Sequence, residues 1–449
     1  MIGRVTSIAV DPRDPAHWLI GGALGGVWET RDTGSTWSPR TDAQASLAVG
    51  AIAFAPSNAN IVYAGTGALL SYGGAGLLKS TDGGSTWTLL ASGTFTRNTF
   101  AAIRVDPNNA DSLIAAVAYG FASHTNFPST PPRGVFRSTD GGATWSKTLA
   151  GDATTVVVDP TNFSNQYVGL GHPFGSSSNG VYRSTNAGLT WTPVTGPWVT
   201  MPQGVGRVSV AMAPSNSNTL YIAIQDAFDN NGHDGALLGL FRTDNAWAPT
   251  PTFAQVPNPP PTGALGFCGW VLSYNQEQDS CASSMVISTD PAQPDILYAG
   301  GIELWKCTNC AASPTWTEIS KNADDPIHGI KVDQKALAWV GNRLIVGNDG
   351  GVWSTSDGGS TWADHNTNLI VTQFYAGSLH PIDPLFALGG SQDHGTDKWN
   401  GMESWQAIFG GDGGPNAISA SQPDTHWAVS AQRLDLRRTT DGGVALAKA

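Results

Sequence analysis

One eight-residue phrase recurs along this chain and constrains its fold more than any other feature. Residues 80–87 read STDGGSTW and residues 138–145 read STDGGATW. The pattern is Ser or Thr, any residue, Asp, any residue, Gly, two further residues and Trp. Related copies cover 30–37, 184–191 and 355–362, a truncated copy covers 439–443, and degenerate copies cover 242–247 and 306–316. Self-similarity of this kind indicates a repeat architecture.

Each copy closes a longer unit of roughly 40–55 residues. A strand that ends in Asp-Pro or Ala-Pro comes first, as in IAVDP at 8–12 and IAFAP at 52–56. A second run follows, such as NIVYAGTG at 60–67, and then a third, such as GVFRST at 134–139. The phrase and a fourth short strand, such as WTLL at 87–90, complete the unit. Four short strands without helical periodicity predict an all-β fold, a β-propeller of four-stranded antiparallel blades.

The phrase itself is interpreted as the hairpin turn between the third and fourth strands of a blade. Its Asp and Ser or Thr oxygens accept hydrogen bonds from turn N–H groups, and its Gly permits a positive φ. Its Trp buries a large ring between neighbouring blades. We therefore expect a structural role at the outer rim, and no catalytic role, for the residues at the Asp position. They are Asp32, Asp82, Asp140, Asn186 and Asp357.

The spacing of the units predicts seven blades within 1–366 and two further blade-like repeats within 367–449. The units begin near residues 3, 49, 100, 154, 206, 284 and 328. The unit at 374–414 lacks the phrase, and the last unit, at 415–443, shows three strands and stops. A ring is expected to join its ends, because open sheet edges are a liability. Either seven blades close and a second propeller begins, or eight to nine blades share one ring; we favour the first arrangement.

Composition excludes several classes of protein. Glycine accounts for 54 of 449 residues and charged residues for 13%, which is typical of a turn-rich β protein. The formal net charge of −12 repels phosphate backbones, so we do not expect a nucleic-acid partner. The sequence predicts no membrane span, because it has no run of 18 apolar residues. The opening MIGRVTSIAV lacks an apolar leader region, so we expect any leader to have preceded residue 1.

The phrase matches the Asp-box, and the chain resembles exported bacterial proteins with BNR (sialidase-type) Asp-box repeats. Four further stretches carry the resemblance: GRVTSIAVDP at 3–12, GNDGGVW at 347–353, NTNLIVTQFYAGSLHP at 366–381 and GGSQDHGT at 389–396. Such proteins are grouped with sortilin-type propellers and with two-propeller glycosidases that degrade xyloglucan. The resemblance implies a secreted, periplasmic or cell-surface location.

The chain departs from the catalytic patterns of these relatives. True sialidases carry an early Arg-Ile-Pro motif, which does not occur here, so we do not expect sialidase activity. The xyloglucan-degrading enzymes carry their catalytic base as the Asp of a first-blade TDVGGAY motif. The matching stretch here is GALGGVW at 22–28, and Ala23 stands where that Asp would be. The base implied by the resemblance is therefore expected to be lost.

Three acids flanked by glycine are candidates for glycoside hydrolysis, which uses two carboxylates, roughly 6.5–9.5 Å apart for inversion. They are Asp349 in GNDGG, Asp393 in GSQDHG and Asp412 in GGDGG. Flanking glycine lets a substrate approach the backbone. The alternative is that Asp beside Gly simply makes a turn. His394, next to Asp393, is a candidate ligand-binding residue, and the alternative is a solvated loop histidine.

The stretch QDAFDNNGHDG at 225–235 supplies Asp226, Asp229 and Asp234 as candidate calcium ligands, since Ca²⁺ prefers dense oxygen ligands. The spacing matches no EF-hand loop, so a polar insertion loop is the alternative. Calcium is the one cofactor that the sequence suggests, and the fold requires none.

The four cysteines are Cys268, Cys281, Cys307 and Cys310. In an exported protein we expect disulfides Cys268–Cys281 and Cys307–Cys310, and a four-cysteine zinc site is the alternative. The second pair replaces the start of the degenerate copy at 306–316. It could staple a turn that has lost its usual hydrogen bonds.

Tryptophans beyond the phrase include Trp399 and Trp405, which are candidates for stacking on sugar rings; packing between blades is the alternative. The first functional hypothesis is an exported propeller that binds a polysaccharide or protein partner on its loop face, without a catalytic signature. The alternative is a glycoside hydrolase of the xyloglucanase type that uses the three late acids. A purely structural assembly module is the third. We favour binding, because the repeats that specify the propeller are regular while the catalytic motifs of the relatives are missing.

Overall fold

A computed structural model describes residues 3–69, 71–119, 131–201, 204–228, 235–259, 263–271, 277–279, 281–320, 329–402, 404–432 and 435–448. These residues form nine four-stranded antiparallel sheets and a two-stranded ribbon of β21 (Gly269–Val271) and β22 (Glu277–Asp279). The helical elements that lie wholly within the described ranges are α1 (Ser92–Phe95) and two short 3-10 segments, Pro197–Thr200 and Gly263–Cys268. The predicted all-β fold of four-stranded antiparallel sheets is confirmed.

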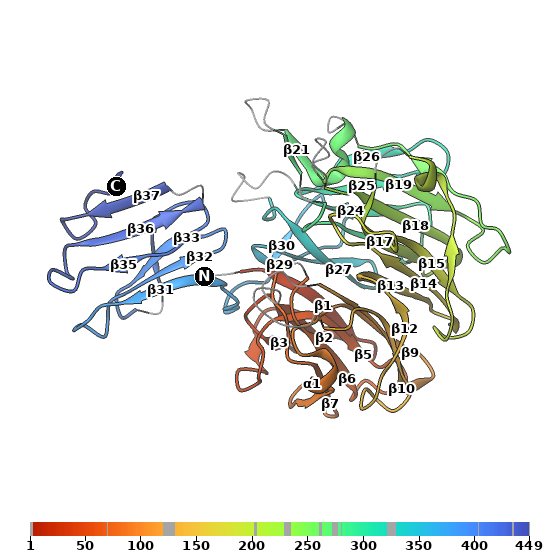
Figure 1. Cartoon of the computed structure of the whole chain (residues 1–449), viewed down its shortest axis with the longest axis horizontal. Coiled ribbons are helices and arrows are strands. Elements are labelled where there is room, and N and C mark those ends of the chain that lie inside the picture. Colours follow the sequence, from red (N-terminus) through yellow and green to blue (C-terminus); the bar gives the residue numbers. More distant parts are fainter. Residues whose placement is uncertain are drawn as a thin grey trace. The chain divides into compact units, whose positions relative to one another are not determined.

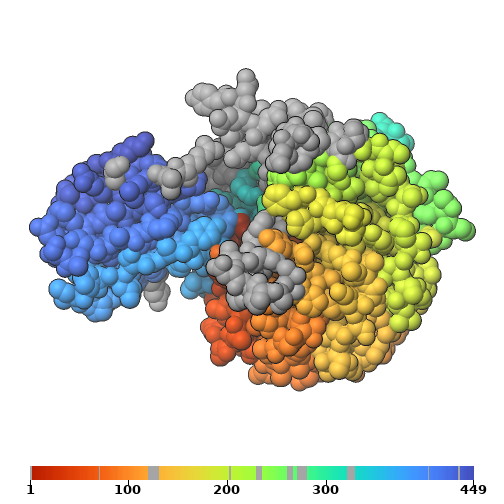
Figure 2. Space-filling view, viewed as in Figure 1, coloured from red at the N-terminus to blue at the C-terminus, as the bar shows by residue number. Residues whose placement is uncertain are grey.

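The chain divides into two compact units. The large unit, Val5–Leu369, contains seven of the four-stranded sheets, and the small unit, Met1–Arg4 with Ile370–Ala449, contains two. Figure 2 shows that the colours follow the chain order around the large unit, from red to teal.

The first four sheets of the large unit contain sixteen strands. They are β1 (Val5–Asp11), β2 (Asp14–Gly22), β3 (Val27–Thr30), β4 (Ser38–Pro39); β5 (Val49–Phe54), β6 (Val62–Thr66), β7 (Leu77–Ser80), β8 (Thr88–Leu90); β9 (Thr99–Asp106), β10 (Asn109–Ala118), β11 (Gly134–Ser138), β12 (Ser146–Ala150); and β13 (Ala153–Asp159), β14 (Asn162–Leu170), β15 (Gly180–Ser184), β16 (Thr192–Val194).

Five further sheets complete the fold. The large unit adds β17 (Val205–Ala213), β18 (Asn216–Asp226), β19 (Leu237–Thr243), β20 (Ala254–Val256); β23 (Val286–Thr289), β24 (Leu297–Gly300), β25 (Leu304–Thr308), β26 (Thr315–Glu318); and β27 (Gln334–Val340), β28 (Arg343–Asn348), β29 (Gly351–Thr355), β30 (Ala363–Asp364). The small unit holds β31 (Phe374–Leu379), β32 (Ala387–Ser391), β33 (Gly395–Trp399), β34 (Gln406–Phe409); and β35 (Ala417–Ile418), β36 (Trp427–Ala431), β37 (Asp435–Thr439), β38 (Ala447–Lys448).

Strands that follow one another in the chain are neighbours in every four-stranded sheet, so each sheet has two distinct ends. Strand direction alternates in an antiparallel sheet. The connections between strands one and two and between strands three and four therefore lie at one end, which we call the turn end. The connections between strands two and three, and those from sheet to sheet, lie at the opposite end, which we call the loop end. The repeated phrase lies at the turn end.

The first strands of the seven sheets in the large unit lie next to one another in chain order, and β1 also lies against β27 (Figure 1). Hydrogen bonds also connect the first sheet to the segment after the seventh. We call this contact, made by Trp37 with His365 and Asn368, the seam. The Trp37 backbone N–H donates to Asn368 Oδ1 at 2.8 Å, and Asn368 Nδ2 donates back to the Trp37 carbonyl at 2.8 Å. The Trp37 indole N–H donates to the His365 carbonyl at 2.7 Å. Residues 331 positions apart therefore close the large unit on itself.

The small unit buries Phe386, Leu388, Trp427 and Val429 between its two sheets. The prediction that its last repeat stops after three strands is wrong, because β38 adds a fourth. This strand has only two residues, so it leaves no hydrophobic pattern from which it could be predicted.

Candidate functional site

The repeated turn uses its carboxylate within the turn itself. Asp140 Oδ1 accepts hydrogen bonds from Ser138 Oγ and from the Thr144 backbone N–H, and Oδ2 accepts one from Thr144 Oγ1. These hydrogen bonds from Thr144 and Ser138 lower the pKa of Asp140 to about 2. Asp32, Asp82 and Asp357 make the same set of hydrogen bonds. Both oxygens of the carboxylate therefore accept hydrogen bonds within the hairpin turn.

An uncharged side chain makes the same turn in the fourth sheet. Asn186 Oδ1 accepts hydrogen bonds from Ser184 Oγ and from the Thr190 backbone N–H, and Asn186 Nδ2 donates to Thr190 Oγ1 at 2.8 Å. The geometry of the turn therefore needs the two side-chain heteroatoms and does not need the negative charge.

Asp349 lies at the loop end of the seventh sheet, in the connection between β28 and β29. Its side chain is buried, with Oδ1 3.7 Å from Lys335 Nζ. Lys335 Nζ also donates to Ser284 Oγ at 2.6 Å and lies 3.9 Å from Asp333 Oδ1. Asp349 is therefore part of a buried polar cluster that ties the sixth sheet to the seventh.

Asp393 and Asp412 both lie at the loop end of the small unit and contact each other. The Asp393 backbone N–H donates to Asp412 Oδ1 at 2.7 Å, and the Asp412 backbone N–H donates to Gln432 Oε1 at 2.7 Å. Asp393 has a φ of 58°, the left-handed value of a tight turn residue. The Asp412 carboxylate thus fixes the turn that carries Asp393 and His394, whose side chains are half-buried.

Trp399 and Trp405 lie at the turn end of the same sheet, away from these acids. Their ring centroids are 6.3 Å apart, and the Trp399 indole N–H donates to the Met402 carbonyl. The whole length of β33 separates the backbone of Trp399 from that of Asp393, about 15 Å at the usual strand rise, and the Trp405 ring lies against Phe374, 5.2 Å between ring centroids. The structure therefore does not bring together the acids and the tryptophans that the sequence singles out.

Trp405 lines an open groove of about 470 Å³ on one face of the β31–β34 sheet. In the large unit, the tryptophan before the fourth strand faces the preceding sheet. The indole N–H donates to an oxygen of that sheet, or of the segment directly after it, at Trp37, Trp191 and Trp362. Trp316, which lies within β26, makes the same kind of contact. Trp405 also directly precedes a fourth strand, so the groove lies where a preceding sheet would pack.

Strand register supports this equivalence. Phe374 pairs with Ser391 and Leu379 with Ala387, with an irregularity after the first pair, just as Val49 pairs with Thr66 and Phe54 with Val62. Val49 and Phe54 are 0% and 7% exposed, whereas Phe374 and Leu379 are 38% and 81% exposed. Positions that form core in the large unit thus face outward within the small unit. We call this surface, lined by Phe374, Leu379 and Trp405, the open sheet face.

The cysteines form the two expected disulfides, Cys268–Cys281 and Cys307–Cys310. All four are buried in one apolar cluster between the fifth and sixth sheets. Asp229 and Asp234 of the calcium prediction lie outside the described residues. Across the described part of the chain, no three His, Cys, Asp or Glu side chains gather as a metal site.

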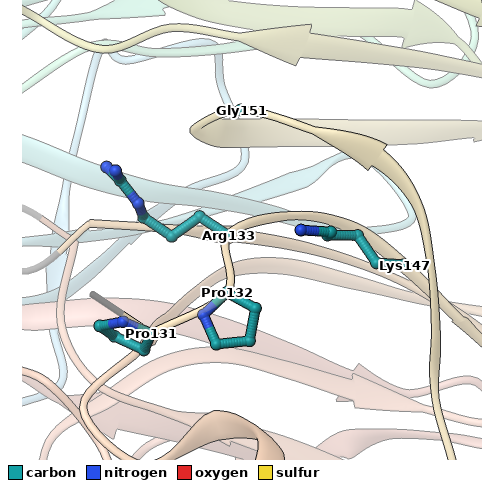
Figure 3. A pocket seen from close by; sticks show the side chains of 5 residues that line it. All are labelled: Pro131, Pro132, Arg133, Lys147 and Gly151. Carbon is teal, nitrogen blue, oxygen red and sulfur yellow. The ribbon is translucent and has the colours of Figure 1, made fainter. Parts of the chain in front are cut away.

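A pocket that the sequence did not indicate opens near the third sheet. It has a volume of about 400 Å³ and is lined by Pro131, Pro132, Arg133, Lys147 and Gly151 (Figure 3). Arg133 is held there because its Nη1 lies 2.8 Å from each carboxylate oxygen of Asp152. No motif marks these residues, since they come from separate turns of the chain.

Solved structures with this arrangement are β-propellers. An ancestral GH74 enzyme matches 99% of the chain with a TM-score of 0.63 at 17% identity, and the chain covers 62% of that enzyme. The GH74 xyloglucanase from Xanthomonas campestris matches 100% of the chain with a TM-score of 0.62 at 17% identity, with 74% of its length covered. YCF48 from Cyanidioschyzon merolae matches 78% with a TM-score of 0.50 at 17% identity, with 95% covered. At this identity the likeness shows the fold, a β-propeller, and no activity.

No protein-family profile and no curated protein sequence matches the chain. Among the described residues, no helix is long and apolar enough to cross a membrane. The disulfides and the carbohydrate-active propeller neighbours are consistent with an extracellular protein.

Proposed function

We propose that this chain is an extracellular β-propeller protein that binds a polysaccharide without hydrolysing it. In this proposal the large unit is a seven-bladed propeller, corresponding to the predicted domain 1–366, its repeated turns are Asp-box hairpins, and 367–449 begins a second propeller. The carbohydrate class is suggested by the fold shared with GH74 enzymes, one of which is a xyloglucanase.

We propose binding in preference to hydrolysis because of the contacts that the candidate carboxylates make. A two-carboxylate mechanism needs one acid to protonate the leaving group and another to act as base or nucleophile. Here Asp412 accepts a backbone hydrogen bond from Asp393, and Asp349 is buried beside Lys335. Ala23, at the position that the resemblance assigns to a base, is buried and has no ionisable group. The printed contacts of Asp349 and Asp412 are contacts to the protein itself, which favours binding over hydrolysis in this proposal.

The test is binding and turnover measured on the same preparation of the full chain. Xyloglucan and cellohexaose serve as probes, with affinity by titration calorimetry and hydrolysis by the release of reducing ends. We expect saturable binding without release of reducing ends. Turnover that is lost in Asp349→Asn or Asp393→Asn but kept in the turn variant Asp357→Asn would establish the hydrolase alternative instead. If neither xyloglucan nor cellohexaose binds, the proposal is wrong.

A protein partner is a second candidate, favoured by the open sheet face. Phe374 and Leu379 hold positions that another sheet covers in the large unit. A partner that supplies a four-stranded sheet would bury these side chains and Trp405. Burying apolar area of this kind contributes roughly 25 cal/mol per Å².

A further inference from the structure

Three neighbouring sheets of the large unit carry aromatic side chains at their loop ends. Tyr119 follows β10 in the third sheet, His172 and Phe174 lie between β14 and β15 in the fourth, and Phe228 follows β18 in the fifth. All three connections join strands two and three, so they lie at the same end of adjacent sheets. The sequence shows no sign of this arrangement, because the rings come from connections about 50 residues apart without a shared motif.

The four rings form one continuous row. Ring centroids are 5.6 Å apart for Tyr119 and His172, 5.9 Å for His172 and Phe174, and 5.3 Å for Phe174 and Phe228. Phe174 is 56% exposed, and the other three are partly exposed. A Phe ring normally contributes most when it is buried, so a Phe174 ring that is more than half exposed at the centre of this row is an observation to be explained. We call this row the aromatic row.

The connection that carries Phe174 is held in place by its own polar groups. Asn179 Nδ2 donates to the His172 carbonyl, and Asn179 Oδ1 accepts from the His172 backbone N–H. The Phe228 backbone N–H donates to the Pro173 carbonyl at 2.9 Å, which ties the fourth sheet to the fifth. The Phe174 backbone N–H also donates to His172 Nδ1 at 3.3 Å, so hydrogen bonds hold the backbone of the connection on both sides of Phe174. A ring carried on a backbone fixed in this way loses less entropy when a ligand stacks on it.

A polar edge borders the row. The Arg133 guanidinium carbon lies 5.6 Å from the centroid of the Tyr119 ring, and Asp152 holds Arg133 at 2.8 Å. The side chain of Arg133 is 26% exposed and that of Asp152 only 9%, so the pair offers the guanidinium donors of Arg133 beside an apolar surface. Flat apolar faces with a rim of donors and acceptors are the property of a pyranose ring, whose C–H groups form its faces and whose hydroxyls form its edge. Ligand-binding sites typically pair apolar walls with a few fixed polar groups. The aromatic row and Arg133 together have this composition.

We propose that the aromatic row is a binding site for a neutral β-linked polysaccharide chain, with Phe174 as the main stacking residue and with Arg133, held by Asp152, donating to hydroxyls at the Tyr119 end. The ligand class rests on the proposed function, and the location is independent of the open sheet face. Consecutive sugar units of an extended chain would lie across the connections of the third, fourth and fifth sheets.

The test compares single variants of the full chain with cellohexaose as the probe, with affinity by titration calorimetry. Phe174→Ala removes the most exposed ring and is expected to weaken binding about tenfold. Phe174→Tyr keeps the ring and is expected to bind like the wild type, whereas Phe174→Leu keeps apolar volume without a flat ring and is expected to resemble Phe174→Ala. Ser176→Ala in the same connection is the matched control and is expected to leave the affinity unchanged. Trp405→Ala tests the open sheet face of the small unit as the rival binding site.

The outcomes separate this inference from the proposed function. Binding that survives Phe174→Ala and is lost in Trp405→Ala overturns the aromatic row as the site but keeps polysaccharide binding. Equal binding by the Ala, Leu and Tyr variants shows that Phe174 does not stack on the ligand. No binding by the wild type overturns both. Far-ultraviolet circular dichroism of each variant checks that the loss of a ring has not unfolded the protein.

Discussion

At the scale of single residues, the repeated turn shows how charge and geometry separate. Asp140 and Asn186 make the same hydrogen bonds to a Ser hydroxyl and a Thr four residues later, but only Asp140 titrates. The lowered pKa of Asp140, about 2, means that its ionised form is favoured in the folded state. The stabilisation is therefore present above the ordinary aspartate pKa of 3.8 and is lost as pH falls through about 2.

Exchanging the two side chains tests this separation. Asp140→Asn is expected to keep the turn at pH 7 but to weaken the dependence of unfolding free energy on pH between about 4 and 2. Asn186→Asp is expected to strengthen that dependence. Asp140→Ala removes the acceptors and is expected to cost about 1 kcal/mol at pH 7. Urea unfolding at pH 7, 4 and 2.5 measures all three, and an unchanged pH profile in Asp140→Asn would contradict the assignment.

At the scale of elements, the seam is the contact on which closure of the large unit depends. Asn368 satisfies both the N–H and the carbonyl of Trp37, and the Trp37 indole reaches His365. His365 also places Nε2 2.8 Å from Ser354 Oγ, and burial lowers the pKa of its imidazole. Short polar contacts thus join two sheets whose strands are far apart in the chain.

Removing the Asn368 amide should weaken the seam selectively. Asn368→Ala leaves the N–H and carbonyl of Trp37 without their partner, and we expect a loss of about 1–3 kcal/mol in unfolding free energy. Hydrogen exchange should accelerate first in β4 and β30. Asn342→Ala, an exposed amide in the same seventh sheet, is the control and should change stability by less than about 0.5 kcal/mol. Equal effects of the two variants would show that Asn368 has no special part in closure.

Elements were predictable where periodicity extends over a whole strand. The expected unit starts near 49, 100 and 154 correspond to β5 at Val49, β9 at Thr99 and β13 at Ala153. The two-residue β38 was missed because two residues carry no pattern. The sequence does not show which candidate residues share a surface, because Asp393 and Trp399 are close in sequence yet lie at opposite ends of β33. The aromatic row was missed because its rings come from separate connections.

At the scale of the whole molecule, the two units differ in how completely their sheets are covered. Each first strand of the large unit has neighbours on both sides, whereas the small unit has two sheets and an open sheet face. Exposed apolar surface of this kind marks interaction sites or a tendency to associate.

The open sheet face should make the protein self-associate as its concentration rises. Leu379 is 81% exposed at a position whose equivalent, Phe54, is core, so Leu379→Asp places a charge where an apolar contact would form. Sedimentation velocity should show association in the wild type and little in Leu379→Asp. Ile382→Asp alters a residue that is 82% exposed in the β31–β32 connection, outside the groove lining, and should behave like the wild type. A monomeric wild type at every concentration would contradict the expectation.

The two sides of the seam are synthesised at different times. Trp37 and Asn368 are separated by 331 residues, and ribosomes add about 5–20 residues per second. The first sheet therefore emerges roughly 17–66 s before the residues that close it against the seventh. During that interval the side of β1 that will meet β27 is uncovered on a nascent chain. The first sheet therefore gains this neighbour only after translation has reached the seventh sheet.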